Sequence, residues 1–381
     1  MASTRDDSGP HVPAMALLEP SRRARFWWWA ALVLLASGYA ALRLTMNEEY
    51  RVAPWDAIVE LRAPLPFGHR VLVPLLARPL VDAGVSLTLA LGIFEAIATA
   101  GLMAATAWTL RPHVGQRLAM AAGLGILCIL PWPYLLPHRW PIFYPWDTPA
   151  MALLMAGLGA IDRRRWTLAL LIAAAAALNR ESAILLPVIA VLWVPPRADD
   201  WRPALARVAG LVAVVLFVRL GVALTLPDNP GPPVHFTVGD GEYRVLNNLR
   251  WLSDPLHVLA AIPSLAAWPL CWPLMRSVVA PRFRRLWFVA WMQTAGLLLV
   301  ANIYEPRAFG EVLVLAFMPA VAGGARWLGL MPEPEAHASP RWLRVVDRHG
   351  AWLVALAFIA FVLALQQWSF LPVAQWPMPR S

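Results

Sequence analysis

The stretch that decides the fold is Trp166–Val194, which reads WTLALLIAAAAALNRESAILLPVIAVLWV. It is apolar throughout except at Asn179-Arg180-Glu181-Ser182, near its middle. A single helix over this stretch would carry an Arg–Glu pair close to the centre of a bilayer, which is costly. Arginines precede and follow the stretch, and positive loops favour the cytoplasm. We therefore predict two short spans, 166–178 and 182–195, hinged at residues 179–182, which return the chain to the side it came from.

The composition of the whole chain indicates a membrane protein. Of the 381 residues, 59% are hydrophobic and 14% are charged, and the mean hydropathy is +0.57. A soluble domain usually has about a quarter of its residues charged, because it must supply a polar exterior. We therefore exclude a soluble globule, a disordered chain and a disulfide scaffold, and we expect the protein to lie in a lipid bilayer.

The basic residues and the cysteines exclude further classes of protein. All 32 basic residues are Arg, so the chain lacks the lysine that a P-loop or a Schiff-base enzyme needs. The net charge is +9, but the arginines fall in short clusters between apolar runs, which is typical of membrane topology rather than of nucleic-acid binding. Cys128 and Cys271 lie in separate apolar segments and predict neither a metal site nor a disulfide framework.

Hydropathy predicts an all-α, polytopic fold with about eleven transmembrane helices in a single transmembrane domain, residues 1–381. Beside the hairpin 166–195, the predicted spans are 26–44, 85–110, 118–136, 147–161, 204–226, 256–275, 286–303, 309–330 and 351–370. The first span is expected to be a signal-anchor, with the tail 1–25 and the loop 331–350 in the cytoplasm. The inner loops are then strongly positive and the outer loops slightly negative, as the positive-inside rule requires.

Two long segments fall on the predicted outer side. In the first outer loop, 45–84, the stretch from Phe67 to Gly84 mixes apolar residues with Arg and Asp, which predicts an amphipathic segment lying in the membrane interface. The second segment, 227–255, begins with several Pro and Gly residues and is expected to have little regular structure there.

Polar chemistry is concentrated on the same outer side. The groups there mix carboxylates, arginines, amides, histidines and aromatic rings, whereas the inner loops carry clustered Arg without this mixture. They fall within residues 47–70, 138–148, 179–181, 240–248 and 302–311. Ionisable residues at membrane depth and broken helices are typical of substrate sites. Such a set suits a reaction in which a base takes a proton and a phosphate leaves. Glu95 lies inside a span, where we expect it to pair with Arg219 or to contact substrate.

These motifs resemble those of the GT-C superfamily of bacterial integral-membrane glycosyltransferases. The matching features are the span layout, an acidic residue in the first outer loop, a hinged Arg-Glu pair between two short spans, an Arg-Val-Leu-x-Pro segment and a late Glu-x-Arg. In this sequence they are Asp56, Arg180-Glu181, Arg70-Val71-Leu72-Val73-Pro74 and Tyr304-Glu305-Pro306-Arg307. The resemblance covers most of residues 26–330, although each motif is short.

The resemblance implies an enzyme that moves a hexose or pentose from a polyprenyl-phosphate donor to a hydroxyl of a glycan or lipid acceptor, with inversion. The protein would lie in the bacterial cytoplasmic (inner) membrane, with its N-terminus in the cytoplasm and its active site facing the periplasm. The general base would be Asp56, with Asp147 as the alternative. The residues expected to contact the substrate or the donor phosphate are His69, Arg70, Arg139, Arg180, Glu181, Tyr304, Glu305 and Arg307. No metal ligand is assigned, because the Asp-x-Asp pair of some members is missing, and a requirement for a divalent ion stays open.

Simpler interpretations compete with each of these roles. Asp56 and Asp147 are also placed to cap helices, Arg180-Glu181 also suits an ion pair that stabilises the hinge, and Glu305 and Arg307 also suit an ion pair. Three other functions share the pattern. An O-antigen polymerase or ligase would depend on Arg rather than on an Asp base. A lipid or sugar transporter would distribute polar residues over both faces. An outer-face acyl- or phosphotransferase would use a His.

Overall fold

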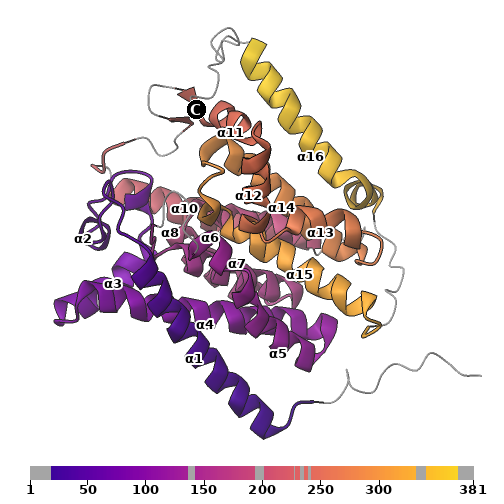
Figure 1. Ribbon diagram of the computed structural model, residues 1–381, viewed down its shortest axis with the longest axis horizontal. Helices are drawn as coiled ribbons and strands as arrows, with labels where there is room; N and C mark the ends of the chain where they lie inside the picture. Colours follow the sequence, from indigo (N-terminus) through magenta and orange to yellow (C-terminus); the bar gives the residue numbers. More distant parts are fainter. Residues whose placement is uncertain are drawn as a thin grey trace, which may run out of the picture.

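The computed structural model describes residues 19–135, 142–193, 201–226, 228–231, 236–238, 242–331 and 340–367. The regular secondary structure of these residues is helical apart from one small ribbon, in which β1 (Thr237–Val238) pairs antiparallel with β2 (Glu242–Tyr243), and the predicted all-α class is confirmed. Figure 1 shows the helices packed side by side, with α1 at one edge and α16 at the other. The α-helices are α1 (Arg22–Met46), α2 (Trp55–Val59), α3 (Leu72–Asp82), α4 (Leu87–Val114), α5 (Gln116–Gly125), α6 (Pro131–Tyr134), α7 (Asp147–Asp162), α8 (Trp166–Asn179), α9 (Leu185–Trp193), α10 (Trp201–Thr225), α11 (Arg244–Leu252), α12 (Pro255–Ser264), α13 (Trp268–Met275), α14 (Pro281–Val300), α15 (Gly310–Trp327) and α16 (Arg341–Gln367).

Among the described residues, six helical runs are long and apolar enough to cross a membrane. They are α1, α4, the run Gln116–Tyr134, α10, the run Pro306–Trp327 and α16. The pair α12 and α13 would make a seventh, but the two are bent by 77° at their junction. The other predicted spans fall on helices that are shorter, such as α7 with 16 residues, or that begin with several charges, such as α14 with Arg282, Arg284 and Arg285 in its first turns. The structure is that of a polytopic membrane protein, and the larger number of about eleven spans stays a prediction.

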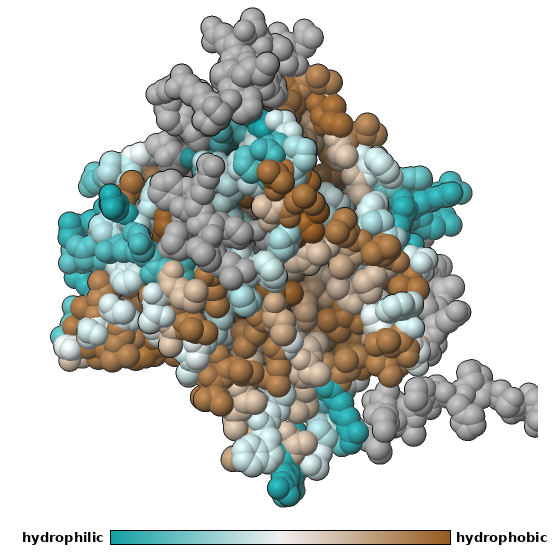
Figure 2. All heavy atoms as spheres, in the orientation of Figure 1, coloured by the Kyte–Doolittle hydropathy of each residue, from teal (hydrophilic) through white to brown (hydrophobic). Residues whose placement is uncertain are grey.

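The surface of the molecule is apolar where a bilayer would contact it. Large apolar side chains are exposed along α1, α10 and α16, including Leu34, Phe217 and Trp352. Figure 2 shows a broad hydrophobic zone between hydrophilic patches, which lie at the upper left, at the bottom and at the right edge. Lipid, rather than water, is the solvent that makes such a surface favourable.

The core is built around α4, α7 and α15. In the run Pro306–Trp327, which contains α15, 72% of the apolar window is buried inside the protein, against 6% for α16. Helices α4 and α7 approach closely because Gly159 faces α4. A β-carbon at that position would lie 2.4 Å from Oγ1 of Thr109 and 2.7 Å from the ring of Trp108. Small residues permit this kind of close packing between helices in a membrane.

The decisive stretch forms two helices separated by a sharp break. Helix α8 ends at Asn179, and Arg180 has an extended backbone with φ −162° and ψ 156°. A 3₁₀ segment, η4 (Glu181–Ile184), then leads into α9. The chain reverses here, because Nε1 of Trp193 at the end of α9 donates to Oδ1 of Asp162, just before α8, at 2.8 Å. The four polar residues therefore lie at one end of a helical hairpin and not in the middle of one long helix.

The ends of the helices form two separate polar clusters. At one end, Asp162 accepts hydrogen bonds from Trp193 and Arg282 and pairs with His113 at 3.0 Å. At the other end, Asp147 and its neighbours form a second cluster. Since α7 runs from Asp147 to Asp162, the two clusters are about 22 Å apart along its axis. Figure 1 shows α7 near the centre of the bundle, so both clusters are surrounded by helices.

The segment 45–84, which the sequence predicts as the first outer loop, contains α2, a 3₁₀ segment η2 (Phe67–His69) and α3. Helix α3 buries Val73 and Ala77 against α4 and leaves Leu75 and Leu76 about half exposed. Its charged side chains are Arg78 and Asp82, 56% and 69% exposed, so α3 has the amphipathic character that its sequence predicts.

Two predicted boundaries differ from the observed ones. Within the segment 227–255, residues 237–238 and 242–243 form the ribbon and residues 244–252 form the helix α11, while 227, 232–235 and 239–241 lie outside the described residues. Helix α16 begins at Arg341, within the predicted loop 331–350. Hydropathy does not detect this polar first turn, because a helix continues beyond the apolar stretch wherever its charged side chains can reach water.

Candidate functional site

The polar cluster that contains Asp147 draws its charged residues from α1, α4, α7, α10 and α15, from the hinge between α8 and α9, and from the segments around Arg70 and Arg307. Five arginines and five carboxylates form three neighbouring groups of ion pairs there, centred on Asp147, Glu181 and Glu305. The arginines are Arg43, Arg70, Arg180, Arg219 and Arg307, and the acids are Glu95, Asp147, Glu181, Glu305 and Glu311. Opposite charges balance within this set, so a bound anion would be held by specific hydrogen-bond donors rather than by a net positive field.

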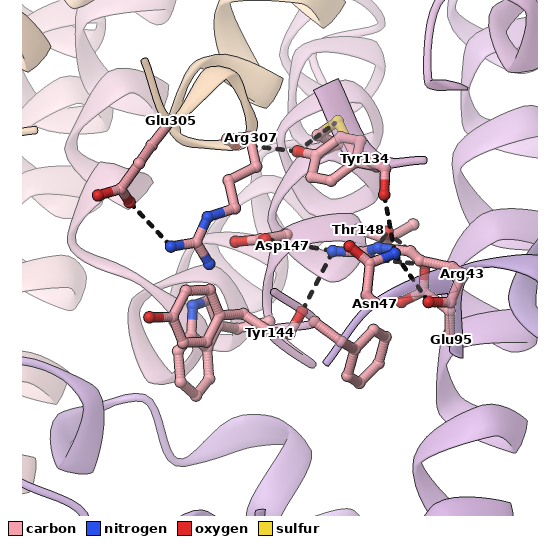
Figure 3. Close-up of polar contacts among 12 residues, drawn as sticks. Arg43, Asn47, Glu95, Tyr134, Tyr144, Asp147, Thr148, Glu305 and Arg307 are labelled. Carbon is pink, nitrogen blue, oxygen red and sulfur yellow. Dashed lines mark hydrogen bonds and ion pairs between the residues drawn. The ribbon is translucent and has the colours of Figure 1, made fainter. Parts of the chain in front are cut away.

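Arg43, in the last turn of α1, lies at the base of the cluster and is fully buried. Its Nη1 donates to Oε1 of Glu95 and to Oγ1 of Thr148, each at 2.7 Å, and its Nη2 donates to Oδ2 of Asp147 at 3.2 Å. Nη2 also reaches the backbone oxygen of Tyr144 at 3.4 Å. Figure 3 shows these four contacts converging on one guanidinium. Arg43 thereby ties α1 and α4 to the start of α7.

Asp147 connects this base to the hinge. It is the first residue of α7, where the helix dipole favours a carboxylate. Its second oxygen, Oδ1, lies 3.5 Å from Nη1 of Arg180, and the same nitrogen lies 3.4 Å from Oε2 of Glu311 on α15. Ser182 donates to the other oxygen of Glu311 at 2.6 Å. With only 3% of its side chain exposed, Asp147 has both oxygens occupied by guanidinium groups.

Glu181 lies on the more open side of the hinge, with 41% of its side chain exposed. Arg70 approaches Oε2 at 3.4 Å, and Arg219 of α10 approaches Oε1 at 3.1 Å. Arg219 also donates to the backbone oxygen of His69 at 2.8 Å. The hinge, the first outer loop and α10 are therefore held together by one carboxylate and two arginines.

Aromatic rings line the space beside these charges. Tyr144, Trp146 and Phe67 stack pairwise, with centroids 5.0 to 5.9 Å apart and planes within 24° of parallel. The guanidinium of Arg70 lies 5.0 Å from the Trp146 ring, and that of Arg307 lies 4.0 Å from the Tyr144 ring. Burial raises the pKa of the Tyr144 phenol, against the opposing effect of Arg307, so this hydroxyl stays protonated at neutral pH.

Arg307 has hydrogen-bond donors that the cluster does not use. It comes from the 3₁₀ segment η6 (Pro306–Phe309), and Figure 3 shows it reaching down onto the Tyr144 ring. Nη2 donates to Oε2 of Glu305 at 2.8 Å, and Asn302 donates to the other oxygen of Glu305 at 2.6 Å. Nε and Nη1 of Arg307 are buried and have no hydrogen-bond partner in the described part of the chain. Buried donors are nearly always satisfied, so these two nitrogens indicate a position for an anionic ligand.

Arg70 is a second candidate for the same ligand. Its Nε is buried without a hydrogen-bond partner among the described residues, and the Arg70 side chain is 11% exposed. Burial lowers the pKa of Arg70 and Glu181 raises it, so a further anion would stabilise the charged guanidinium.

The structure brings most of the predicted site residues together. Arg70, Asp147, Arg180, Glu181, Glu305 and Arg307 belong to the cluster. His69 is buried at its edge, with Nε2 3.4 Å from the backbone oxygen of Leu226, and Tyr304 lies beside Trp251, with ring centroids 6.5 Å apart. Arg139 falls outside the described residues.

Asp56 is the candidate base that lies outside the ion-pair set. It is exposed in the first turn of α2, and no hydrogen bond to its side chain is present among the described residues. Its neighbour Trp55 packs on Phe143 and donates to the backbone oxygen of that residue at 3.4 Å. Because Tyr144 follows Phe143, Asp56 is anchored next to the segment that carries the aromatic rings.

One predicted pair is wrong, and one residue was missed. Glu95 pairs with Arg43 and not with Arg219, which pairs with Glu181 instead. The two partners are set by helix packing, since α1 lies against α4 and α10 lies against α8. Arg43 was not predicted as part of the site. Its position inside the apolar span 26–44 was the signal that could have identified it.

Within the described ranges, no group of three or more His, Cys, Asp or Glu side chains is arranged to hold a metal ion. Comparisons with family models, with curated proteins and with solved structures found no match to this chain.

Proposed function

We propose that this protein is a membrane glycosyltransferase that takes a sugar from a polyprenyl-phosphate donor and attaches it to an acceptor hydroxyl on the extracytoplasmic face. The proposal rests on the resemblance of the sequence to the GT-C superfamily and on the chemistry of the polar cluster. The donor lipid would reach the cluster from the bilayer, since the helices around it are apolar on their outer surfaces.

The observation that carries the proposal is the guanidinium of Arg307. Its two buried, unused donors, Nε and Nη1, point to different edges of the guanidinium, so either one can donate a charge-assisted hydrogen bond to a phosphate oxygen. The ring of Tyr144 fixes the plane of this guanidinium at 4.0 Å, and Glu305 holds its third nitrogen. Arg70, which lies 5.0 Å from the Trp146 ring of the same aromatic group, offers a further donor from Nε.

The reaction balances without an additional reagent. The acceptor oxygen attacks the anomeric carbon of the donor and gives its proton to the carboxylate of Asp56. The bond between the anomeric carbon and the phosphate oxygen breaks, and polyprenyl phosphate leaves with one more negative charge. Arg307 and Arg70 stabilise that developing charge. Direct displacement inverts the configuration of the sugar.

Asp56 suits the base better than Asp147 does. A base must have a free oxygen within hydrogen-bonding distance of the acceptor hydroxyl. Both oxygens of Asp147 are occupied by Arg43 and Arg180, whereas Asp56 is exposed and unpaired among the described side chains. We assign Asp147 a positioning role, in which it holds Arg43 and Arg180 in place.

The test is transfer of labelled sugar in proteoliposomes that contain the full-length protein. The donors are undecaprenyl-phosphate-linked glucose, galactose, mannose and arabinose, and the acceptor is membrane from cells that lack this chain. We expect Asp56→Asn to abolish transfer of the active sugar. Asp82→Asn, which changes an exposed aspartate on α3, is the matched control and should transfer at the wild-type rate.

A second candidate function is an Arg-dependent transferase of the O-antigen polymerase or ligase type. It is favoured by the five arginines of the cluster, because such a reaction needs cations rather than a carboxylate base. Full activity of Asp56→Asn together with loss of activity in Arg307→Gln would replace the proposed mechanism by this one. If none of the donors is used by the wild-type protein, the proposed function fails.

A further inference from the structure

A group of arginines at the opposite end of the bundle is separate from the candidate site. The turn between α13 and α14 exposes two successive backbone oxygens, and an arginine from a different helix binds each of them. Nη1 of Arg326, in the last turn of α15, donates to the oxygen of Val278 at 3.3 Å. Nε of Arg284, in the first turns of α14, donates to the oxygen of Val279 at 2.9 Å. The two guanidinium groups therefore meet at one turn.

A third arginine adds to the charge of this turn. Arg276 follows α13 directly and donates through Nη2 to the backbone oxygen of Arg348 on α16. Its guanidinium also lies 5.5 Å from the ring of Trp272. We call Arg276, Arg284 and Arg326 the inner arginine group, and the elements that supply it are α14, α15 and the end of α13.

Carboxylates do not neutralise this group. Among the described residues, none of the three arginines forms an ion pair, in contrast to every arginine of the candidate site. Asp347 on α16 is nearby, but Nε and Nη2 of Arg285 bind its two oxygens at 2.8 and 3.1 Å. Nε of Arg326 is buried and has no hydrogen-bond partner in the described ranges. The group thus has an excess of positive charge and an unused donor.

Apolar side chains surround the inner arginine group. Leu274, two residues before Arg276, is 78% exposed, and Trp327 and Leu328, directly after Arg326, are 78% and 67% exposed. An exposed Trp next to arginines at the end of an apolar helix is typical of the boundary between acyl chains and headgroups. A ligand at this place would contact positive charge with one part and exposed hydrocarbon with another.

We propose that the inner arginine group binds the phosphate of an anionic phospholipid such as phosphatidylglycerol, with the acyl chains on Leu274, Trp327 and Leu328. Arginine forks bind phosphate oxygens, and basic pockets between membrane helices on the cytoplasmic side hold anionic headgroups. A free phosphate would use the arginines but not the exposed apolar side chains. The site is independent of the proposed transferase activity, because it lies at the other end of the bundle.

The experiment measures the dissociation constant of fluorescent phosphatidylglycerol from the full-length protein in a neutral detergent. We expect Arg284→Gln and Arg326→Gln each to weaken binding about fivefold, and the double variant about 25-fold. Arg326→Lys keeps the charge and should lose less than Arg326→Gln, which separates lost charge from disturbed folding. Arg344→Gln, which removes an exposed arginine of α16, is the matched control and should bind as the wild type does.

Three outcomes would overturn the proposal. Equal weakening by Arg344→Gln would mean that only diffuse positive charge attracts the lipid. Displacement of the lipid by millimolar inorganic phosphate would mean that the arginines form a site for the free anion. Equal affinity for phosphatidylcholine would mean that the phospholipid is not selected by its net charge.

Discussion

The substitution Arg307→Gln tests the site most directly, because the geometry predicts different effects on activity and on stability. In the wild type, Nε and Nη1 are buried and unused by the described chain, while only Nη2 bonds to a side chain, Glu305. A hydrogen bond to a charged group contributes about 1.5–3 kcal/mol. One such bond to the leaving phosphate is therefore worth about 1.5–3 kcal/mol, which corresponds to a rate loss of about 10 to 10²-fold.

The expected cost in folding stability is smaller. Glu305 is 26% exposed and keeps its bond from Asn302 at 2.6 Å, so the lost ion pair is worth about 1 kcal/mol. The melting temperature in detergent should therefore fall by about 4 °C or less. If the pair of Arg307 and Glu305 has only a structural role, the loss of activity should be no larger than the loss of stability explains.

The assay compares initial rates of sugar transfer in proteoliposomes with the affinity of the purified protein for undecaprenyl phosphate. We expect both to fall in Arg307→Gln and to recover partly in Arg307→Lys, since lysine restores the charge without the fork. Arg62→Gln is the matched control, because Arg62 is an exposed arginine in the loop after α2 and also forms an ion pair with a glutamate, Glu60. A rate loss of less than about tenfold in Arg307→Gln would refute the assignment of the phosphate to Arg307.

Two further predictions concern the packing that positions the site. Arg43→Leu leaves the fully buried carboxylate of Glu95 without its ion pair and should destabilise the protein by about 3–5 kcal/mol. Adding Glu95→Leu should restore much of this loss, and thermal unfolding in detergent measures both variants. If the double variant does not recover stability, the ion pair is not the source of the effect. Gly159→Leu inserts a side chain at a position where even a β-carbon would lie 2.4 Å from Oγ1 of Thr109. Helices α4 and α7 should therefore separate, and the melting temperature should fall by an amount that corresponds to about 1–3 kcal/mol. A substitution at Gly125, which has open space around it, is the control and should change little.

The candidate site could be predicted from the sequence in outline only. The outer polar groups were visible as charged residues next to apolar runs, and the structure brings Arg70, Asp147, Arg180 and Arg307 into one set of contacts. The role of each residue, such as base or positioning group, could not be predicted from the sequence. Asp147 is an equally good base in the sequence, and only its two arginine neighbours, which come from distant segments, occupy its oxygens.

The sequence by itself determined that the chain is a helical membrane protein and that Trp166–Val194 cannot be one continuous span. Both conclusions follow from local cost, since apolar runs need lipid and an Arg–Glu pair is expensive at the centre of a bilayer. Only the tertiary structure decided which charges meet. Arg43 and Glu95 are 52 positions apart, and Arg180 and Glu311 are 131 positions apart. A buried charge must find a partner, but the choice of that partner depends on which helices lie side by side.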